Sequence, residues 1–570
     1  HQPIAAARIS RTNESPGGKN PPMLERADRS GNGCAKSHHG APRAMMLNFA
    51  PHKPWTVQTI GDVRCAVAGY FDDLPSFLSM LQKADLEGIK RHLRAQNLCF
   101  GLMIEGPDLA FAALDRIRSF PVFYHKDFSV FGNHAPSLAS DLQTHVHLDN
   151  LTQFAMAGYV LGDQTLHNDV LALQTSQLLY ATSQARVIED YYLYAPRPQP
   201  ISEQDALQSL DHALDEAIKA VIDKASGAPV WVPLSGGLDS RLVLAKLHQH
   251  GCPNLQTFSY GLSGNFEAQT AKKIAKILNV PWCMVATRPK KARALYLSDE
   301  RKAYEAFSHN YACIPSYVEY EAIQRLKHDH IATPESFIIN GQTGDFISGG
   351  HVPDILYSKE NPTQDDVLNY IVEKHFSLWL SLKTPKNVDT LKSRIRALLL
   401  PDDAALSIRD NLMRAYECFE WRERQGKVVV QSQRIYDFFG YRWLLPLWDS
   451  RVMDFFETLP FDKKQKQRFF KTYLKSYNYK GVFDVPVAQA RNWAPHQFWI
   501  VAIANALKIL HSDDAKKAFY KRMLYYGHSH HQYALFGKAS YNIHAVDIRN
   551  MISLSVRDFC ESHSLKFPCS

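Results

Sequence analysis

The sequence has 570 residues, of which 45% are hydrophobic and 21% are charged. This length allows about two to four domains, and the composition excludes collagen-like, wholly disordered and disulfide-scaffold proteins. The formal net charge is +8, but residues 1–44 carry half of it, with seven Lys and Arg against three acidic residues. Because the remaining chain is close to neutral for its size, no nucleic-acid partner is predicted.

Cysteine spacing and hydropathy predict the compartment. The nine cysteines are scattered without a CxxC pair, which argues against structural zinc and favours a reducing environment. The most apolar stretch of the second half, residues 498–510, is shorter than the roughly 20 residues that a membrane span needs. No signal-peptide core is visible. We therefore expect a cytoplasmic protein with no membrane partner.

The first third of the chain divides into a prefix and a strand-rich region. Residues 1–44 contain five Gly, five Pro and no Phe, Trp or Tyr, so we predict a disordered prefix. Residues 45–194 show short apolar or alternating runs between turn residues, which predict strands. The predicted elements are strands at Val63–Tyr70, Cys99–Ile104, Leu109–Leu114, Val122–Tyr124 and Ser129–Phe131, with a helix at Leu86–Leu93.

A proline-rich linker, residues 195–202, separates this region from a second domain at 203–570, because proline continues neither a helix nor a strand. In the second domain strands and helices alternate, which is typical of a doubly wound parallel sheet. The predicted elements are helices at Glu203–Lys224, Arg241–His250 and Glu267–Leu278, and strands at Val230–Leu234, Thr257–Tyr260 and Trp282–Val285. Beyond residue 360 the pattern is mostly helical.

One motif indicates chemistry. The string Ser235-Gly-Gly-Leu-Asp-Ser240 follows the first strand of the predicted sheet and opens the next helix. Its glycines allow a tight turn, and the helix start adds unpaired amides and a positive dipole end, so the loop is predicted to bind a phosphate chain. Asp239 would repel phosphate unless a cation lies between them, which predicts Mg²⁺. A tight turn needs glycine for its backbone alone, so glycine content without the full string is a weak signal.

The full string resembles the pyrophosphate loop of the N-type ATP pyrophosphatases. Other segments resemble the asparagine synthetase branch of that superfamily, with β-lactam synthetases and lasso-peptide cyclases as cousins. Thr257–Leu262 is similar to the adenine-contacting strand, Asn340–Gly350 to the second ATP loop, and Leu445–Asp449 and Phe470–Leu474 to the turn and helix that follow. The resemblance implies ATP and Mg²⁺ as cofactors, with Asp239 and Asp345 as metal ligands. It also implies an ATP site at Leu234, Ser235, Gly236, Gly237, Asp239, Ser240, Tyr260, Asn340, Gly341 and Gly344.

The strand-rich region resembles a class II glutaminase domain in part. Ala112–Arg116 with Phe120–Tyr124 is similar to the "ARDR…PLYY" stretch of that domain. Such a glutaminase uses an amino-terminal Cys whose own α-amine is the base. Cys65–Gly69 faintly resembles that start, but 64 residues precede it, and the family's "NGEIYN" segment is missing between Gly69 and Cys99. We therefore expect a degenerate glutaminase half without activity. Together the resemblances imply an α/β protein in which a degenerate Ntn-hydrolase-like α+β sandwich precedes a doubly wound parallel-sheet ATP-pyrophosphatase domain with a helical C-terminal part.

The synthetase half departs from the family at two catalytic positions. The family's second loop reads "G-E-G", whereas this chain has Gln342 and Thr343, and a glutamine amide cannot act as a base. The family's "R-x-K" becomes Arg491-Asn-Trp493 here, so Arg491, Lys480 and Lys471 are candidate replacements for the lysine. Catalytic roles are assigned to Asp239, Asp345, Gln342 and Arg491.

These observations predict an AMP-forming carbon–nitrogen ligase of asparagine synthetase type. A substrate carboxylate attacks the α-phosphate of ATP, pyrophosphate leaves, and ammonia or an amine captures the acyl-adenylate. Three substrates stay open: free aspartate, a uronic acid on a surface polysaccharide, and an acid joined to an intramolecular amine, which would make the protein a cyclase. A nucleotide-binding pseudoenzyme or scaffold is the alternative of another class, and a homodimer is one assembly that we consider.

Overall fold

The computed structural model describes residues 45–139, 145–487 and 535–568, together with 502–503, 505–506 and 519. All of these lie in one compact unit, Pro42–Ser570. The predicted prefix, Arg491 and most of the apolar stretch 498–510 lie outside the described residues. Among the helices of the described part, none is both long and apolar enough to cross a lipid bilayer.

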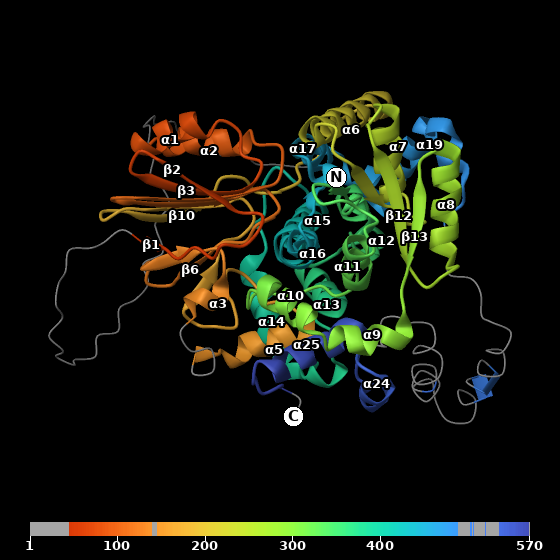
Figure 1. Ribbon diagram of the computed structural model, residues 1–570. Coiled ribbons are helices and arrows are strands. Elements are labelled where there is room, and N and C mark those ends of the chain that lie inside the picture. Colours follow the sequence, from red (N-terminus) through yellow and green to blue (C-terminus); the bar gives the residue numbers. More distant parts are fainter. Residues whose placement is uncertain are drawn as a thin grey trace, which may run out of the picture. The chain divides into compact units, whose positions relative to one another are not determined.

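Two sheets and two helices build the layers of the N-terminal part (Figure 1). The larger sheet is antiparallel, in the order β10–β9–β5–β4–β3–β2, and comprises β2 (Thr56–Ile60), β3 (Val63–Gly69), β4 (Phe100–Gly106), β5 (Leu109–Leu114), β9 (Gln177–Ala181) and β10 (Arg186–Asp190). The smaller sheet, in the order β1–β7–β6–β8, comprises β1 (Met46–Leu47), β6 (Phe123–His125), β7 (Val130–Gly132) and β8 (Val170–Ala172). Helices α1 (Leu74–Gln82) and α2 (Leu86–Arg94) cover the larger sheet.

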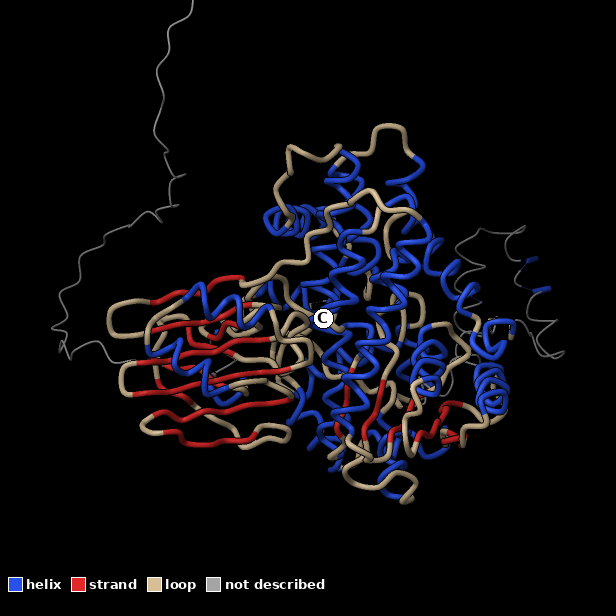
Figure 2. The backbone as a smooth tube through the Cα atoms, turned by 90° about the horizontal axis from the view of Figure 1, so that it is seen from above, coloured by secondary structure: helices blue, strands red, loops and turns tan. Residues whose placement is uncertain are grey.

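The central strands of the larger sheet, β4 and β5, are buried on both faces. Leu102 and Phe111 belong to the apolar core beneath α1 and α2, together with Phe77. Met103 and Ala112, the next residues along the same two strands, belong to the other core, which includes the smaller sheet. Since successive strand residues face opposite sides, this sheet separates two apolar layers. The expected α+β sandwich is therefore confirmed, and its stacked strands are seen from above in Figure 2.

Some strands differ from the sequence-based prediction for local reasons. All five residues of β2 are exposed at the sheet edge, so no apolar alternation marks this strand. The strands predicted at 122–124 and 129–131 begin one residue later, as β6 and β7, which is the usual uncertainty of an element boundary.

A five-stranded parallel sheet, in the order β13–β12–β11–β14–β15, is the centre of the second part. Its strands are β11 (Val230–Pro233), β12 (Leu255–Gly261), β13 (Trp282–Ala286), β14 (Phe337–Ile339) and β15 (Arg442–Leu444). The helices α6 (Glu203–Ala225), α7 (Asp239–Gln249) and α8 (Phe266–Leu278) alternate with the first strands. In Figure 1, α8 and α11 (Tyr320–His328) lie on opposite sides of β13. This confirms the predicted doubly wound sheet; the sequence pattern misses β14 and β15, which have three residues each.

The rest of the second part is helical, as predicted. Its main helices are α13 (Gln364–His375), α14 (Pro385–Leu398), α15 (Ile408–Phe419), α16 (Arg434–Phe439), α17 (Ser450–Thr458), α19 (Arg468–Tyr477) and α25 (Met551–Ser562). Helix α15 continues into a π-helix, η3 (Glu420–Val429). Such π-helical turns are rare and occur often at functional sites.

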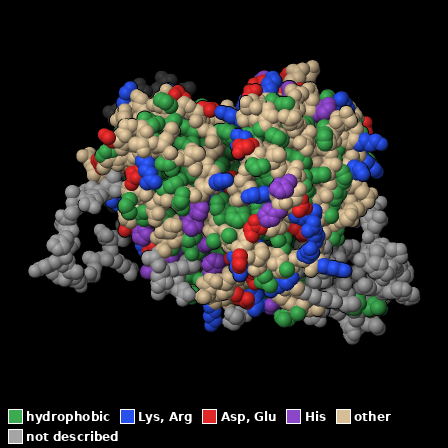
Figure 3. All heavy atoms as spheres, viewed as in Figure 1, with side chains coloured by type: hydrophobic (Ala, Val, Ile, Leu, Met, Phe, Trp, Pro, Cys, Tyr) green, Lys and Arg blue, Asp and Glu red, His purple; other side chains and the backbone are tan. Residues whose placement is uncertain are grey.

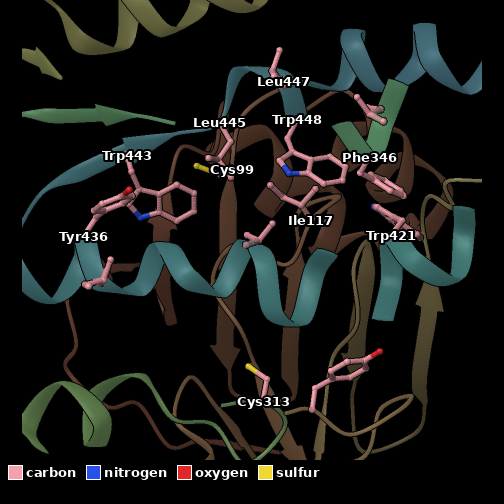
Figure 4. Close-up of a cluster of buried hydrophobic side chains, with 14 of the residues drawn as sticks. Cys99, Ile117, Cys313, Phe346, Trp421, Tyr436, Trp443, Leu445, Leu447 and Trp448 are labelled. Carbon is pink, nitrogen blue, oxygen red and sulfur yellow. The ribbon is translucent and has the colours of Figure 1, made fainter. Parts of the chain in front are cut away.

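The N-terminal part and the parallel-sheet part share one apolar core. Figure 4 shows Cys99 and Ile117 of the former among Trp421, Trp443 and Trp448 of the latter, and all five belong to one buried cluster. Burial of large aromatic side chains is among the strongest contributions to an interface, so each part stabilises the other.

The proline-rich segment is held against α17. The backbone N–H groups of Arg197 and Gln199 donate hydrogen bonds to the carbonyl oxygens of Glu457 and Thr458, at 2.9 and 2.8 Å. These bonds attach the segment to the C-terminal end of α17, so it is not a free tether.

Charged side chains of both signs are interspersed on the face of the molecule shown in Figure 3. This mixture agrees with the small net charge that remains once the basic prefix is set aside.

Candidate active site

The first loop of the site joins β11 to α7, which begins at Asp239. Two serines close the loop. The Ser235 N–H donates to Ser240 Oγ (3.2 Å), the two hydroxyl oxygens lie 3.1 Å apart, and the Gly237 N–H donates to Ser235 Oγ (3.1 Å). No described side chain caps the start of α7, so its first amides are left for another group. A helix N-terminus at the carboxyl end of a parallel strand is a favourable place for phosphate.

The second loop, residues 340–345, lies directly against the first. A Cβ atom on Gly341 would lie 2.6 Å from the backbone nitrogen of Ser240, and one on Gly344 would overlap the carboxyl group of Asp239. Only glycine allows so close an approach. Between the two glycines, Thr343 has a φ of 84°, a conformation that β-branched residues rarely adopt and that is often found at functional sites.

The two predicted metal ligands meet where the loops touch. The Asp345 N–H donates to Asp239 Oδ2 at 3.1 Å, although 106 residues separate the two in the sequence. Burial and the nearby charge of Asp345 raise the pKa of Asp239 to about 7. Such a raised pKa means that the ionised pair needs positive charge beside it.

The carboxylate pair fits Mg²⁺, which prefers oxygen ligands. Asp239 Oδ1 makes no hydrogen bond to a described residue, whereas the two oxygens of Asp345 accept from the Phe346 N–H and from His351. Within the described part of the chain, no group of three or more His, Cys, Asp or Glu is arranged to hold a metal by itself. Phosphate oxygens of a nucleotide would therefore have to complete the coordination of an ion at this pair.

His351 links the second loop to a buried glutamate. Its Nε2 lies 3.0 Å from Asp345 Oδ2, and its Nδ1 is bonded to Glu420 Oε1. Burial alone would lower the pKa of His351, but the two carboxylates raise it to about 9. Burial would also raise the pKa of Glu420, but His351, with His375 and Lys374, holds that pKa far below its usual range. His351 is therefore a cation at neutral pH.

Gln342 lines the cleft between the loops with one end of its amide unused. Its Nε2 donates to Ser432 Oγ at 3.0 Å, while its Oε1 is buried without a partner among the described residues. A buried acceptor without a donor is costly unless a ligand or water supplies one.

A hydrogen-bond network forms the wall of the cleft next to β12. The Tyr260 and Tyr436 hydroxyls donate to the two carboxylate oxygens of Glu319, at 2.9 and 2.6 Å, and Asn340 Nδ2 donates to the Tyr436 hydroxyl at 3.2 Å. Burial raises the pKa of Glu319 in spite of these bonds. The network fixes β12, the second loop and α16 relative to one another.

The cavity between the loops has a volume of about 610 Å³. It is lined by eight of the predicted ATP-binding residues, namely Leu234, Ser235, Gly237, Asp239, Ser240, Tyr260, Asn340 and Gly341, and also by Gln342 and Asp345. Gly236 and Gly344 belong to the same loops but do not line the cavity. We call this cavity the ATP cleft.

Two of the proposed substitutes for the family lysine do not reach the described lining of the ATP cleft. Lys471 Nζ donates to the carbonyl oxygen of Lys466, and Lys480 Nζ lies 5.6 Å from the ring centre of Tyr479. Arg491 lies outside the described residues, so its role stays a prediction.

Sequence reasoning misses several residues of the ATP cleft. Glu319, His351, Gln425 and Gln467 line it, but they come from separate elements and share no motif. Only His351 gives a local signal, because it follows directly after the second-loop segment that ends at Gly350.

The asparagine synthase family model matches residues 209–480, which include both loops. The region that these residues form, 209–480, belongs to the asparagine synthase family. No curated protein matches the chain. A solved structure of the NH3-dependent NAD synthetase from Campylobacter jejuni, in complex with the nitrate ion, is similar at 16% identity. The match covers 36% of this chain and 99% of that chain, with a TM-score of 0.20. The family match supports ATP-dependent amide formation as the general activity.

Proposed function

We propose that the ATP cleft transfers AMP to a substrate carboxylate and that an amine then captures the acyl-adenylate. The observation that supports this most is the meeting of Asp239 and Asp345 where two glycine-containing loops touch. Ser235, Ser240 and the open start of α7 would hold the β- and γ-phosphates, and Tyr260 would lie near the adenine end. Asp239 and Asp345 would hold Mg²⁺, which supplies positive charge to the polyphosphate.

The reaction balances without a further co-reactant. A carboxylate oxygen forms a bond to the α-phosphorus as the bond from that phosphorus to the bridging oxygen of pyrophosphate breaks. The amine nitrogen then bonds to the acyl carbon, AMP leaves with the carboxylate oxygen, and the amine loses a proton. The helix start and the loop amides stabilise the charge that develops on pyrophosphate, and the cleft holds the reactants together.

Gln342 would orient the amine without deprotonating it. Gln342 lines the ATP cleft, and its buried Oε1 has no partner among the described residues, so this oxygen would accept an N–H from the nucleophile. An amide takes up no proton at neutral pH. The amine must therefore arrive neutral or give its proton to another group, such as one on the substrate.

We propose further that the N-terminal part does not hydrolyse glutamine. Cys65 lies in the middle of β3 and its side chain is fully buried in the layer beneath α1 and α2. Burial raises the pKa of its thiol, whereas a nucleophilic cysteine needs access and a lowered pKa. The full chain should release no glutamate from glutamine. Release that disappears in Cys65→Ala would contradict this proposal.

An ATP–pyrophosphate exchange assay tests the proposed ligase. The acids to be supplied are aspartate, glutamate, glucuronate and a peptide that carries both an acidic side chain and a free amine. We expect at least one acid to support exchange and Asp239→Asn to reduce its rate at least 100-fold. Asp354→Asn is the matched control, because Asp354 is an exposed residue whose partner is Lys466, 3.5 Å away, and it should leave the rate unchanged. An equal rate of ATP–pyrophosphate exchange in Asp239→Asn and in the wild type would overturn the proposed role of Asp239 as a metal ligand.

A further inference from the structure

A second cavity, of about 510 Å³, lies where β12 and β13 end. Tyr260 and Glu267 line both this cavity and the ATP cleft. The rest of its lining comes from α8, α11, the start of α25, α9 (Pro289–Tyr296), α10 (Asp299–Ser308) and the loops between them. Its volume is typical of sites for small organic molecules.

Aromatic rings form much of the wall of this second cavity, which we call the aromatic cavity. The rings belong to Tyr260, Phe266, Tyr296, Tyr317 and Tyr320. The Tyr296 hydroxyl donates to Asp558 at 2.6 Å and the Tyr317 hydroxyl donates to Glu305. Neither acceptor lines the aromatic cavity. Because these hydroxyls are already occupied, the two tyrosines offer a ligand their rings, and such rings bind apolar groups and organic cations.

Carboxylates without an ion pair outnumber free cations in the lining. Arg301 is the one cation among the described lining residues, and its Nη1 lies 2.5 Å from Glu305 Oε2. Glu267 and Glu321 also line the aromatic cavity, and neither forms an ion pair with a described residue. Burial raises the pKa of Glu321 in spite of nearby arginine charges. The aromatic cavity therefore keeps an excess of negative charge.

Two hydrogen-bond acceptors lie close together in the same lining. Thr287 Oγ1 is buried and has no hydrogen-bond partner among the described residues. The N–H of the next residue, Arg288, donates to Glu321 Oε1 at 2.7 Å, which holds the Glu321 carboxylate beside Thr287. Hydroxyl and carboxylate oxygens both accept from an ammonium group. A buried polar atom without a partner calls for an explanation, and a bound ligand is one.

We infer that the aromatic cavity binds an organic ammonium ion with an apolar or aromatic body. The body would lie against the rings, and the ammonium group would lie between Glu321 and Thr287, with Glu267 as a second carboxylate. A neutral ligand would leave both carboxylates without a cation, and an anion would be repelled by them. This site is separate from the chemistry of the ATP cleft, so the inference does not depend on the proposed ligase function.

Calorimetry on the full chain with three indole compounds tests the inference. Tryptamine, tryptophol and indole-3-acetate share one ring system and carry a positive charge, no charge and a negative charge. We expect the wild type to bind tryptamine about tenfold or more tightly than tryptophol, and indole-3-acetate more weakly than either. Equal affinities for tryptamine and tryptophol would overturn the inference, as would no saturable binding of tryptamine.

Glu321→Gln separates the charge from the shape of the site. Glutamine can still accept the Arg288 N–H, so the fold should be kept. Tryptamine affinity should fall about fivefold or more, because a charge-assisted hydrogen bond is lost, while tryptophol affinity should stay within about twofold. Binding of α,β-methylene-ATP with Mg²⁺ should also stay within about twofold, because Glu321 does not line the ATP cleft. Unchanged tryptamine affinity in Glu321→Gln would overturn the inference.

Two further variants serve as controls. Glu360 is exposed and lines neither cavity, so Glu360→Gln should bind tryptamine as the wild type does. An equal loss in Glu360→Gln and Glu321→Gln would show a general charge effect and overturn the site. Val318 lines the aromatic cavity and is half-exposed, so Val318→Ser should weaken tryptamine and tryptophol by the same factor. No effect of Val318→Ser on either compound would place them elsewhere on the protein and overturn the inference.

Discussion

Replacing Gly344 with alanine should damage the metal site more than the fold. The added Cβ would overlap the Asp239 carboxyl group, whereas the φ of Gly344 is not positive, so alanine can adopt this backbone. The displaced carboxylate would lose its hydrogen bond from the Asp345 N–H, which costs about 1.5–3 kcal/mol for a charged acceptor. Alanine is less flexible than glycine in the unfolded chain, which raises the free energy of unfolding by about 0.4–1 kcal/mol. The net loss of stability is therefore about 0.5–2.6 kcal/mol, a shift of a few degrees in Tm at most.

The effect on nucleotide binding should be larger. A misplaced partner of a metal site typically costs about 10–100-fold in affinity, so Mg²⁺-dependent binding of α,β-methylene-ATP should weaken by that factor in calorimetry. Gly341→Ala is the comparison, because its Cβ would meet the backbone of Ser240 at 2.6 Å. Helix α7 must then move, so Gly341→Ala should lower both Tm and affinity. Affinity within twofold of the wild type in Gly344→Ala would refute the reasoning.

Three further changes have expected outcomes. Gln342→Glu should not produce asparagine from aspartate and ammonia, because a pocket reshaped for another acid gains nothing from a new carboxylate; a clear gain would indicate simple drift from an asparagine synthetase. Thr343→Gly should raise Tm by about 1–2 °C, since glycine removes the cost of a β-branched residue at φ 84°; an unchanged or lower Tm would count against strain there. Burial, with the charges of His563 and His134, lowers the pKa of His309 to about 3. Below pH 6.5 the unfolded chain therefore binds a proton that the folded chain does not, and stability should fall by up to about 1.4 kcal/mol per pH unit for this group. The decrease in Tm from pH 7 to pH 5 should be smaller in His309→Phe, and an equal decrease would exclude His309 as a source.

The parts of the site that the sequence predicts are those with local causes. The Ser235–Ser240 loop is one continuous string between a strand and a helix, so its turn, helix start and carboxylate can be read together. The parallel sheet follows in the same way from alternation of strands and helices. The prediction of Asp345 as a metal ligand depends on the family resemblance, because no local pattern in the sequence places Asp345 beside Asp239.

The parts that the sequence misses depend on tertiary contacts. Glu420 reaches His351 across 69 residues, and Glu319 reaches Tyr436 across 117. The residues of each pair are too far apart in the sequence for the periodicity of one helix or strand to bring them together. The exposed edge strand β2 is missed for a similar reason, because burial creates the pattern that reveals a strand.

The identity of the products tests the central claim most directly. The full chain, Mg²⁺, ATP, the acid that supports exchange and an excess of ammonia would be followed by phosphorus NMR, with ¹⁸O in the carboxylate of the acid. The account predicts AMP and pyrophosphate as products, ¹⁸O transferred to the phosphate of AMP, and loss of turnover in Asp239→Asn. Formation of ADP and inorganic phosphate, or AMP without ¹⁸O, would contradict it.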